Sequence, residues 1–274
     1  MGIPGYTRWL RLRFSGAFHA VRPSRPLAAQ CPAGQRRGGF DHVHFDLAAR
    51  LYMVSGRAQD TGHLVRLLLR DLHRVVRWVA PRRSVTLAID GVPPAAKLWT
   101  QRIRRFDRKR GESGGSGPSR GIDTLSFTLG TLMMRQIGLA LSFFAVQALQ
   151  ARDFASTVFY VSGPEVIGEG EHKLHARVLS LLGSCPAESH LITGNDADLI
   201  VQACAAAAVV EERQAALPPR SRLLPGGGAA PNGTDSFDQL TLLLTCGSPN
   251  PVIPVLRSFL NRSFTICCQN HSLV

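Results

Sequence analysis

Runs of strand-type residues alternate with helix-type segments along the first two hundred residues, and this alternation limits the fold more than any other feature. Four short runs, FDHVHFDLA, SVTLAID, STVFYVS and SHLIT, are interpreted as strands, the first of which ends near Asp46. Between them, segments such as TGHLVRLLLRDLHRVVRWVA carry apolar residues at helical spacing. The alternation predicts an α/β fold with a mostly parallel sheet and helices on both faces.

Three segments are predicted along the 274 residues. Residues 1–39 hold a short helix over 7–14 and a basic Pro/Gly-rich arm without regular structure. Residues 40–210 hold the α/β core, which includes predicted helices over 95–110 and 126–151. Beyond about residue 212 no period is visible, so 211–274 is predicted to be an irregular, divergent tail. The apolar run 125–149 is interrupted by Arg135 and Gln136, and we interpret it as a buried helix, not a membrane span.

The formal net charge of +13 favours a polyanionic partner. Nucleic acid is the simplest such partner, and an anionic membrane surface comes second. The six cysteines form no C-x-x-C pair, which argues against a zinc site and favours a reduced, intracellular protein. We therefore expect a nucleic-acid partner and no membrane; the sequence leaves protein partners open.

Acidic residues follow each of the four predicted strands. The carboxyl ends of parallel strands meet at one edge of a sheet, so these side chains are expected to converge. Carboxylates this close repel one another unless cations lie between them, and oxygen ligands suit Mg²⁺ or Mn²⁺. Two such ions could activate water for phosphodiester cleavage. The predicted ligands are Asp46, Asp90, Glu169, Glu171, Asp196 and Asp198.

Each acid also has an ordinary structural explanation. A single aspartate at a strand end is more often a helix cap or a turn residue. Asp196 and Asp198 could cap a helix that begins near Ala197, and GEGE could begin a helix whose dipole favours acids. We assign Glu165 to a solvated turn. The register of the whole set with the strand ends favours the metal site.

A basic helix face follows Asp90 directly. Lys97, Gln101, Arg104 and Arg105 recur at i, i+4, i+7 and i+8, which places them on one side of a helix. Four hydrogen-bond donors on one face suit a terminal phosphate. The alternative is a solvated basic face.

Five separated motifs occur in an order that resembles one known family. They are MGIPGYTRWL, LAIDGVPPAAKLWTQRIRRF, LGTLMMRQ, VSGPEVIGEGEHK and ITGNDADLI. Over about residues 1–205 the chain resembles the N-terminal nuclease region of the 5′→3′ exoribonuclease (Xrn) family. The resemblance implies a PIN/FEN-like nuclease core.

The resemblance also implies a role for each matching position. The six acids would be catalytic metal ligands for two Mg²⁺ or Mn²⁺ ions, and the four residues of the basic face would bind a 5′-monophosphate. Tyr52 stands where the family has a histidine that stacks on the 5′-terminal base. The implied activity is hydrolysis of single-stranded RNA from a 5′-monophosphorylated end. The sequence does not decide between nucleus and cytoplasm, and we place the nucleus slightly ahead.

Two departures from the family pattern limit what we expect of this chain. DLAARLY replaces the family's Asn-Gly turn after Asp46, and no V-G-N-D-F-L-P motif supplies the family's further metal-binding aspartate. We therefore expect a truncated core that binds metal weakly and has low exonuclease activity. The alternative is a non-catalytic RNA-binding remnant of the family.

Overall fold

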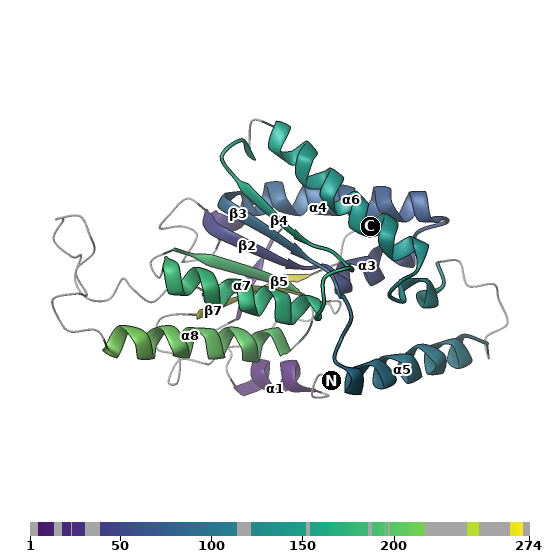
Figure 1. The fold of residues 1–274 in the computed structure, drawn as a ribbon. Helices are drawn as coiled ribbons and strands as arrows, with labels where there is room; N and C mark the ends of the chain where they lie inside the picture. Colours follow the sequence, from purple (N-terminus) through teal and green to yellow (C-terminus); the bar gives the residue numbers. More distant parts are fainter. Residues whose placement is uncertain are drawn as a thin grey trace. The chain divides into compact units, whose positions relative to one another are not determined.

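The computed structural model describes residues 5–13, 18–22, 24–30, 39–113, 122–151, 154–185, 188–194, 196, 198–216, 240–246 and 264–270. The elements in chain order (Figure 1) are α1 (Tyr6–Arg13), β1 (Phe18–Val21), η2 (Leu27–Ala29), β2 (Phe40–Asp46), α3 (Ala48–Ser55), α4 (Thr61–Val79), β3 (Pro81–Ala88), α5 (Ala95–Ser113), η3 (Thr124–Phe127), α6 (Leu132–Gln150), β4 (Val158–Ser162), α7 (Gly170–Ser184), β5 (His190–Gly194), α8 (Asp198–Ala216), β6 (Leu240–Cys246) and β7 (Phe264–Asn270).

The chain forms two compact units. The first comprises residues 1–44, 78–82 and 175–274, and the second comprises residues 45–77 and 83–174. Strand β2 contributes its first five residues to the first unit and its last two residues to the second.

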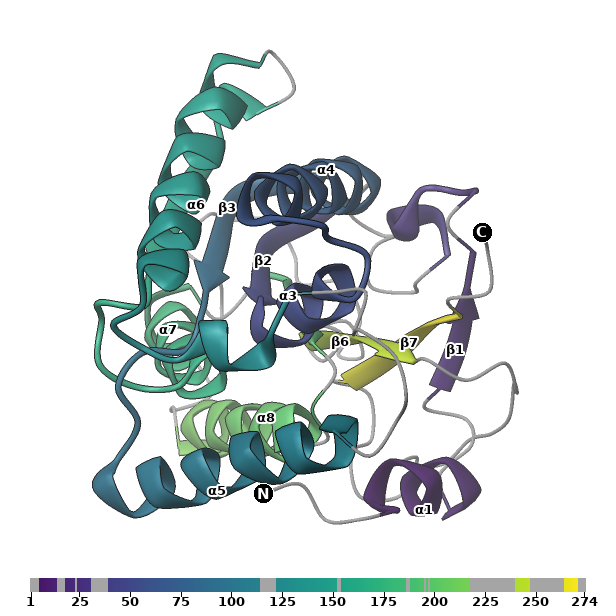
Figure 2. The ribbon, with the colours of Figure 1, turned by 90° about the vertical axis from the view of Figure 1, so that its right-hand side faces the viewer.

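The first unit contains four parallel strands in the order β1-β7-β6-β5. Figure 2 shows β1, β7 and β6 side by side. His190 of β5 lies opposite Leu240 of β6, which in turn lies opposite Phe264 of β7. The start of β2 lies beside β5, where the His42 amide donates to the Ser189 carbonyl at 2.9 Å. Helices α1, α7 and α8 share a core with β5, whose buried members are Leu10, Val178, Leu182, Ile192, Leu199, Ile200, Ala203, Ala206 and Ala207.

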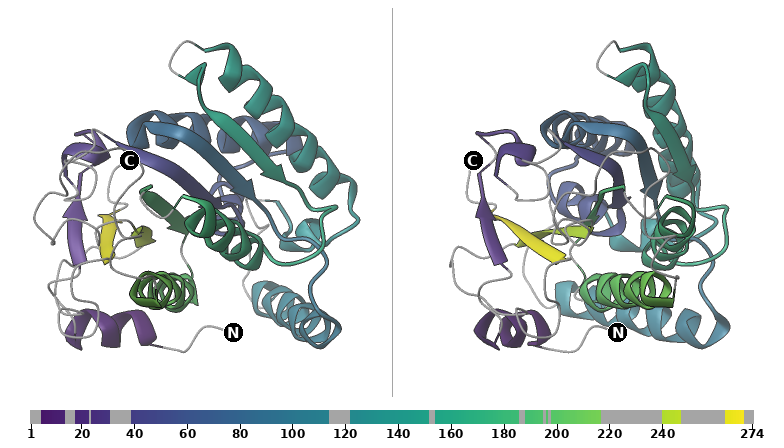
Figure 3. Two further views of the ribbon diagram at one scale, coloured as in Figure 1. Left: turned by 60° about the vertical axis from the view of Figure 1, so that its left-hand side comes forward. Right: turned by 90° about the vertical axis from the view of Figure 1, so that its left-hand side faces the viewer.

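In the second unit, β3 and β4 are parallel, and their register runs from Ser84 opposite Val158 to Ala88 opposite Ser162. Helix α6 runs alongside β4 (Figure 3). Helix α4 buries one apolar stripe at helical spacing, as its sequence predicts. The members of this stripe that lie in the second unit are Leu64, Leu68, Leu72, Val75 and Val76.

A buried ion pair joins α3 to α4. The Arg50 guanidinium donates to Asp71 at 2.6 Å, and both side chains are less than a tenth exposed. Arg74 donates to the second oxygen of the same carboxylate at 2.6 Å. Each carboxylate oxygen of Asp71 therefore has a charged donor, which compensates for its burial.

The α/β class and the parallel sheet are confirmed, and every predicted strand lies within a few residues of an observed one. The arm after the first helix was predicted to lack regular structure, and this is wrong for β1 and η2. The four residues of β1 have no period of their own and are held by pairing with β7, almost 250 residues later in the chain.

The structure adds elements that the sequence pattern does not predict. Helix α3 follows β2 directly, and α5 continues to Ser113 into the Gly/Ser-rich segment. The remainder of that segment, residues 114–121, lies outside the described residues. Strands β6 and β7 lie within 211–274, so the prediction of an irregular tail is wrong for these two segments. The compact units cut across the three predicted segments, whose boundaries stay a prediction.

Of the described helices, α6 is long and apolar enough to cross a membrane by length and composition alone. About 39% of its apolar window is buried within the protein. The buried residues Met134, Ile137, Leu141, Phe144 and Ala148 recur at helical spacing. One face of α6 therefore packs into the protein. The other face leaves Leu139, Phe143 and Val146 more than half exposed, so the prediction of a buried helix holds for one face only.

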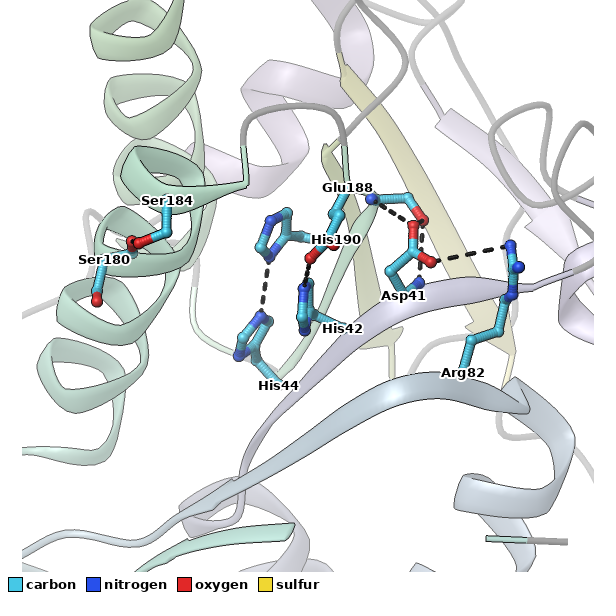
Figure 4. Close-up of polar contacts among 9 residues, drawn as sticks. Asp41, His42, His44, Arg82, Ser180, Ser184, Glu188 and His190 are labelled. Carbon is cyan, nitrogen blue, oxygen red and sulfur yellow. Dashed lines mark hydrogen bonds and ion pairs between the residues drawn. The ribbon is translucent and has the colours of Figure 1, made fainter. Parts of the chain in front are cut away.

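A cluster of three buried histidines lies between β2 and β5 (Figure 4). His190 stacks on His42 with ring centroids 4.8 Å apart, and its Nδ1 lies 3.2 Å from Nε2 of His44. His42 contacts the Glu188 carboxylate at 2.5 Å. Beside the cluster, Asp41 accepts hydrogen bonds from both the amide and the hydroxyl of Ser189.

The pKa of His190 is lowered to about 3, and burial is the largest cause. Nearby His42 and Arg177 contribute to this lowering, and the carboxylate of Asp41 opposes it. Burial also lowers the pKa of His44 well below its usual value, and His190, His42 and Arg177 act in the same direction. The folded chain therefore takes up fewer protons at these rings than the unfolded chain does.

This difference predicts a loss of stability in acid. Because the pKa of His190 is lower in the folded state, its contribution is complete above about pH 6.5 and falls as the pH drops. At about pH 5, His190 alone should lower the free energy of unfolding by about 2 kcal/mol. Urea unfolding at about pH 7.5 and pH 5 measures this loss. His190→Gln should reduce the pH dependence, whereas His73→Gln, on the exposed side of α4, should not. An equal pH dependence in both variants would contradict the assignment.

Candidate active site

Two aspartates mark the carboxyl ends of β2 and β3. Asp46 is the last residue of β2 and is buried, with 5% of its surface exposed. Ile89 separates the end of β3 from Asp90. The Ile89 amide donates to the carbonyl of Ser162, the last residue of β4. The strand ends therefore fix where the chain presents Asp90.

Two loops pair through their backbones just beyond these strand ends. The Gly91 amide donates to the Gly168 carbonyl at 2.8 Å, and the Gly168 amide donates to the Val92 carbonyl at 2.9 Å. Gly168 has a φ of +105°, which favours glycine. A Cβ on Gly91 would lie 1.7 Å from the Val166 carbonyl oxygen, so a larger residue cannot fit there. Glu169 is the residue that follows Gly168, so the pairing of the two loops sets where its backbone lies.

The N-terminus of α7 meets both aspartates. The Gly170 amide donates to Oδ1 of Asp90 at 2.9 Å. A Cβ on Gly170 would lie 3.0 Å from Oδ1 of Asp46 and 3.4 Å from Oδ1 of Asp90. Glycine thus lets the helix start approach the two carboxylates, and the positive end of the helix dipole favours negative charge there.

Glu169 and Glu171 flank this glycine, and both are largely buried. Their side chains are 6% and 11% exposed. Together with His172, each offers a ligand atom within 4.8 Å of the others'. Within the described part of the chain, Oε1 of Glu169 is buried without a hydrogen-bond partner. A buried carboxylate oxygen without a partner is costly.

These features fit a divalent cation. The available donors are carboxylate oxygens, which Mg²⁺ and Mn²⁺ prefer. A cation at Oε1 of Glu169 would supply the missing partner. Of the six predicted ligands, the structure brings together Asp46, Asp90, Glu169 and Glu171 around the start of α7 in the second unit.

Lys97, at the start of α5, donates to Oε2 of Glu169. Its ammonium also lies 3.8 Å from the carboxylate of Glu171. Burial lowers the pKa of Lys97, but the hydrogen bond and the charges of Glu169, Glu171 and Asp90 outweigh it, so the pKa is raised overall. Lys97 therefore stays protonated and neutralises part of the acidic cluster.

Lys173 has a structural role that the sequence pattern did not predict. Its ammonium donates to the carbonyls of Ile89 and Gly163, both at 2.9 Å, and so joins the ends of β3 and β4. Burial lowers its pKa, and the charges of Asp90 and Glu165 oppose this effect. The motif GEGEHK contains Lys173, but its carbonyl partners are distant in sequence and carry no side-chain signal. Gly170 was missed because its contact with Asp90 is made by the backbone amide, which every residue except proline has.

Asp196 and Asp198 lie in the first unit, between β5 and α8. The Asp198 amide donates to Oδ1 of Asp196 at 3.2 Å, and Asp198 is the first residue of α8. This contact is the one expected of a helix cap. The pKa of Tyr6 in α1 is raised, chiefly by burial. Cys204 and the charge of Asp198 contribute to this increase. A metal-ligand role for these two aspartates stays a prediction.

The remaining predicted residues stand as follows. Gln101 is half-buried on α5, and the side chains of Arg104 and Arg105 lie outside the described part of this helix. Tyr52 is 37% exposed and makes an edge-to-face contact with Phe127, with ring centroids 5.4 Å apart. Base stacking by Tyr52 stays a prediction.

Buried carboxylates gathered at the carboxyl ends of parallel strands are typical of hydrolases that cleave phosphodiester bonds. The comparisons with known proteins specify the family. A family model described as XRN 5'-3' exonuclease N-terminus matches residues 1–210. The chain belongs to this family of 5'-3' exoribonucleases, which confirms the resemblance drawn from its motifs.

Curated relatives that match the chain are named as 5'-3' exoribonucleases, and the chain spans a quarter or less of their length. The chain is 29% identical over 244 residues to a 5'-3' exoribonuclease 2 of Gibberella zeae, 28% over 222 residues to a 5'-3' exoribonuclease 1 of Homo sapiens, and 25% over 237 residues to a 5'-3' exoribonuclease 2 of Saccharomyces cerevisiae. Each match covers 73% of this chain. The matched parts amount to 25%, 12% and 24% of these relatives.

Proposed function

We propose that this chain is the nuclease region of a metal-dependent exoribonuclease that hydrolyses single-stranded RNA from a 5′-monophosphorylated end. The observation that carries the proposal is the acidic cluster at the start of α7, with its buried and unpartnered Glu169 Oε1. Mg²⁺ or Mn²⁺ held there would activate water and stabilise the leaving oxygen. The protein's part is to hold the carboxylates in place and to position the RNA end.

Recognition of the 5′ end is assigned to α5. Lys97 lies at the acidic cluster, and Gln101 lies one turn further along the same helix. Arg104 and Arg105 follow at helical spacing, so a phosphate bound by this helix face would lie close to the metal ligands. The family relation and the net charge of +13 support RNA as the substrate. An intracellular location, with the nucleus ahead of the cytoplasm, is part of the same proposal.

Cleavage of labelled RNA tests the proposal. The purified chain is incubated with 5′-monophosphorylated and 5′-hydroxyl RNA in Mg²⁺ and in Mn²⁺, beside an Asp196→Ala/Asp198→Ala double variant. We expect slow release of nucleotides from the phosphorylated RNA, faster in Mn²⁺ and absent from the double variant. Salt-dependent RNA binding without cleavage would favour the second candidate, a non-catalytic RNA-binding protein, which the net charge also supports.

Arg104→Ala is expected to reduce the preference for phosphorylated over hydroxyl RNA ends by about tenfold, because a charge-assisted hydrogen bond to phosphate would be lost. Arg102→Ala is the matched control, since Arg102 is an exposed cation on the same helix. It should weaken binding to both RNAs equally. If Arg104→Ala also acts equally on both RNAs, α5 is a solvated basic face.

A further inference from the structure

The contact between Lys97 and Glu169 joins residues that are 72 positions apart in the chain. The two side chains differ in exposure: 32% for Lys97 and 6% for Glu169. The carboxylate is therefore held within the protein, whereas the lysine reaches it from the rim with part of its long chain in solvent.

The charge balance of the cluster explains this contact. Asp46, Asp90, Glu169 and Glu171 gather at the start of α7, and carboxylates at such spacing repel one another. The Lys97 ammonium contacts one oxygen of Glu169, and the other oxygen has no partner among the described residues. The Lys97 ammonium thus contacts the carboxylate that a divalent ion would use.

We propose that Lys97 is a positioning residue that serves as the counter-ion of Glu169 and leaves this carboxylate when a divalent cation binds. An ammonium and a divalent ion on the same carboxylate repel each other strongly in a partly buried site. The Glu169 side chain is 6% exposed and that of Lys97 is 32% exposed, so the lysine is the partner with room to move. Its flexible stem allows this without a backbone change.

The displaced ammonium can then bind another anion. If the proposed function holds, that anion is the 5′-phosphate of the RNA, since Gln101 and Arg104 follow Lys97 along the same helix. The phosphate would draw Lys97 away from Glu169 and so favour the ion, and the ion would release Lys97 for the phosphate. Metal and phosphorylated end would therefore bind with positive coupling, which is reciprocal by thermodynamic necessity.

The first test uses Mn²⁺ alone, so its outcome does not depend on RNA or on the proposed function. Calorimetry measures Mn²⁺ affinity of the unaltered chain, Lys97→Met and Arg102→Met. Both variants lose one positive charge from α5, but only Lys97→Met removes the contact with Glu169. We expect Lys97→Met to bind Mn²⁺ about fivefold to tenfold more tightly, and Arg102→Met to change affinity less than about twofold.

Equal affinities in the two variants, or weaker binding by Lys97→Met, would overturn the counter-ion role. Lys97→Gln keeps a hydrogen-bond donor without the charge and should also bind Mn²⁺ more tightly. If circular dichroism shows that Lys97→Met is unfolded, Lys97→Gln is used in its place. A merely structural role for Lys97 would not raise the affinity of either variant.

A second test addresses the coupling. Mn²⁺ affinity is measured with and without a cleavage-resistant dinucleotide that carries either a 5′-phosphate or a 5′-hydroxyl. In the unaltered chain the phosphorylated dinucleotide should raise Mn²⁺ affinity about threefold or more, and in Lys97→Met it should have less effect. The same coupling in both proteins would overturn the exchange of Lys97 between the two anions. No phosphate binding at all would instead overturn the proposed 5′-end recognition and leave the first test standing.

Discussion

Glu169→Gln is expected to weaken Mn²⁺ binding by about a hundredfold and to abolish any RNA cleavage. The substitution keeps the shape of the side chain but removes the charge of a carboxylate that is 6% exposed and has an unpartnered oxygen. An amide is a weaker ligand for a hard cation, and it also loses the ion pair with Lys97. Calorimetry with Mn²⁺ and the RNA assay measure the two losses.

Glu165→Gln is the matched control for this experiment. Glu165 lies four residues earlier, is exposed, and was assigned from the sequence to a solvated turn. Removing its charge should change Mn²⁺ affinity less than about threefold, through long-range electrostatics alone. If the two variants weaken Mn²⁺ binding to the same extent, the cluster at the start of α7 does not hold the ion.

Gly91→Ala is expected to lower the free energy of unfolding by about 3 kcal/mol or more. The new Cβ would lie 1.7 Å from the Val166 carbonyl oxygen and 2.8 Å from its carbon, both backbone atoms that cannot swing aside. The two hydrogen bonds between Gly91, Val92 and Gly168 would then break. Urea unfolding measures the effect, and Mn²⁺ affinity should fall with it because Glu169 follows this loop.

Gly56→Ala provides the comparison. Gly56 has a φ of −64° at the end of α3, and a Cβ there would meet nothing within 4 Å. This substitution should change stability by about 0.5 kcal/mol or less. A similar small effect of Gly91→Ala would mean that the two loops separate more readily than their hydrogen bonds indicate.

The sequence predicts the strands of the core because their signal is local. The segments that became β2, β3 and β5 are long enough to be recognised as strands without knowledge of the strands with which they pair. The four acids of the second unit were found in the same way, from their place after strands. Alternation of strands and helices was sufficient to predict parallel pairing.

Features that depend on distant partners were not predictable. Strand β1 is only four residues long and is defined by its register with β7. The acceptors of Lys173 are backbone carbonyls, which every residue has. Lys97 was assigned to a phosphate, and its contact with Glu169 depends on how α5 leaves the loop after Asp90. These contacts come from tertiary packing, which local sequence patterns do not encode.

The lysine that joins the ends of β3 and β4 has a kinetic consequence. Lys173 holds Ile89 and Gly163 together as soon as the chain has folded. The conformational entropy of these loops is therefore lost on folding and not when a ligand binds. In the proposed exchange, ion uptake requires rotation of the Lys97 side chain away from Glu169 but no change of the backbone. Mg²⁺ dehydrates reluctantly, so loss of water from the arriving ion adds a slow step of its own. A site that is ordered before the ion arrives therefore leaves the breaking of one ion pair and the dehydration of the metal as the steps that set the speed of ion capture.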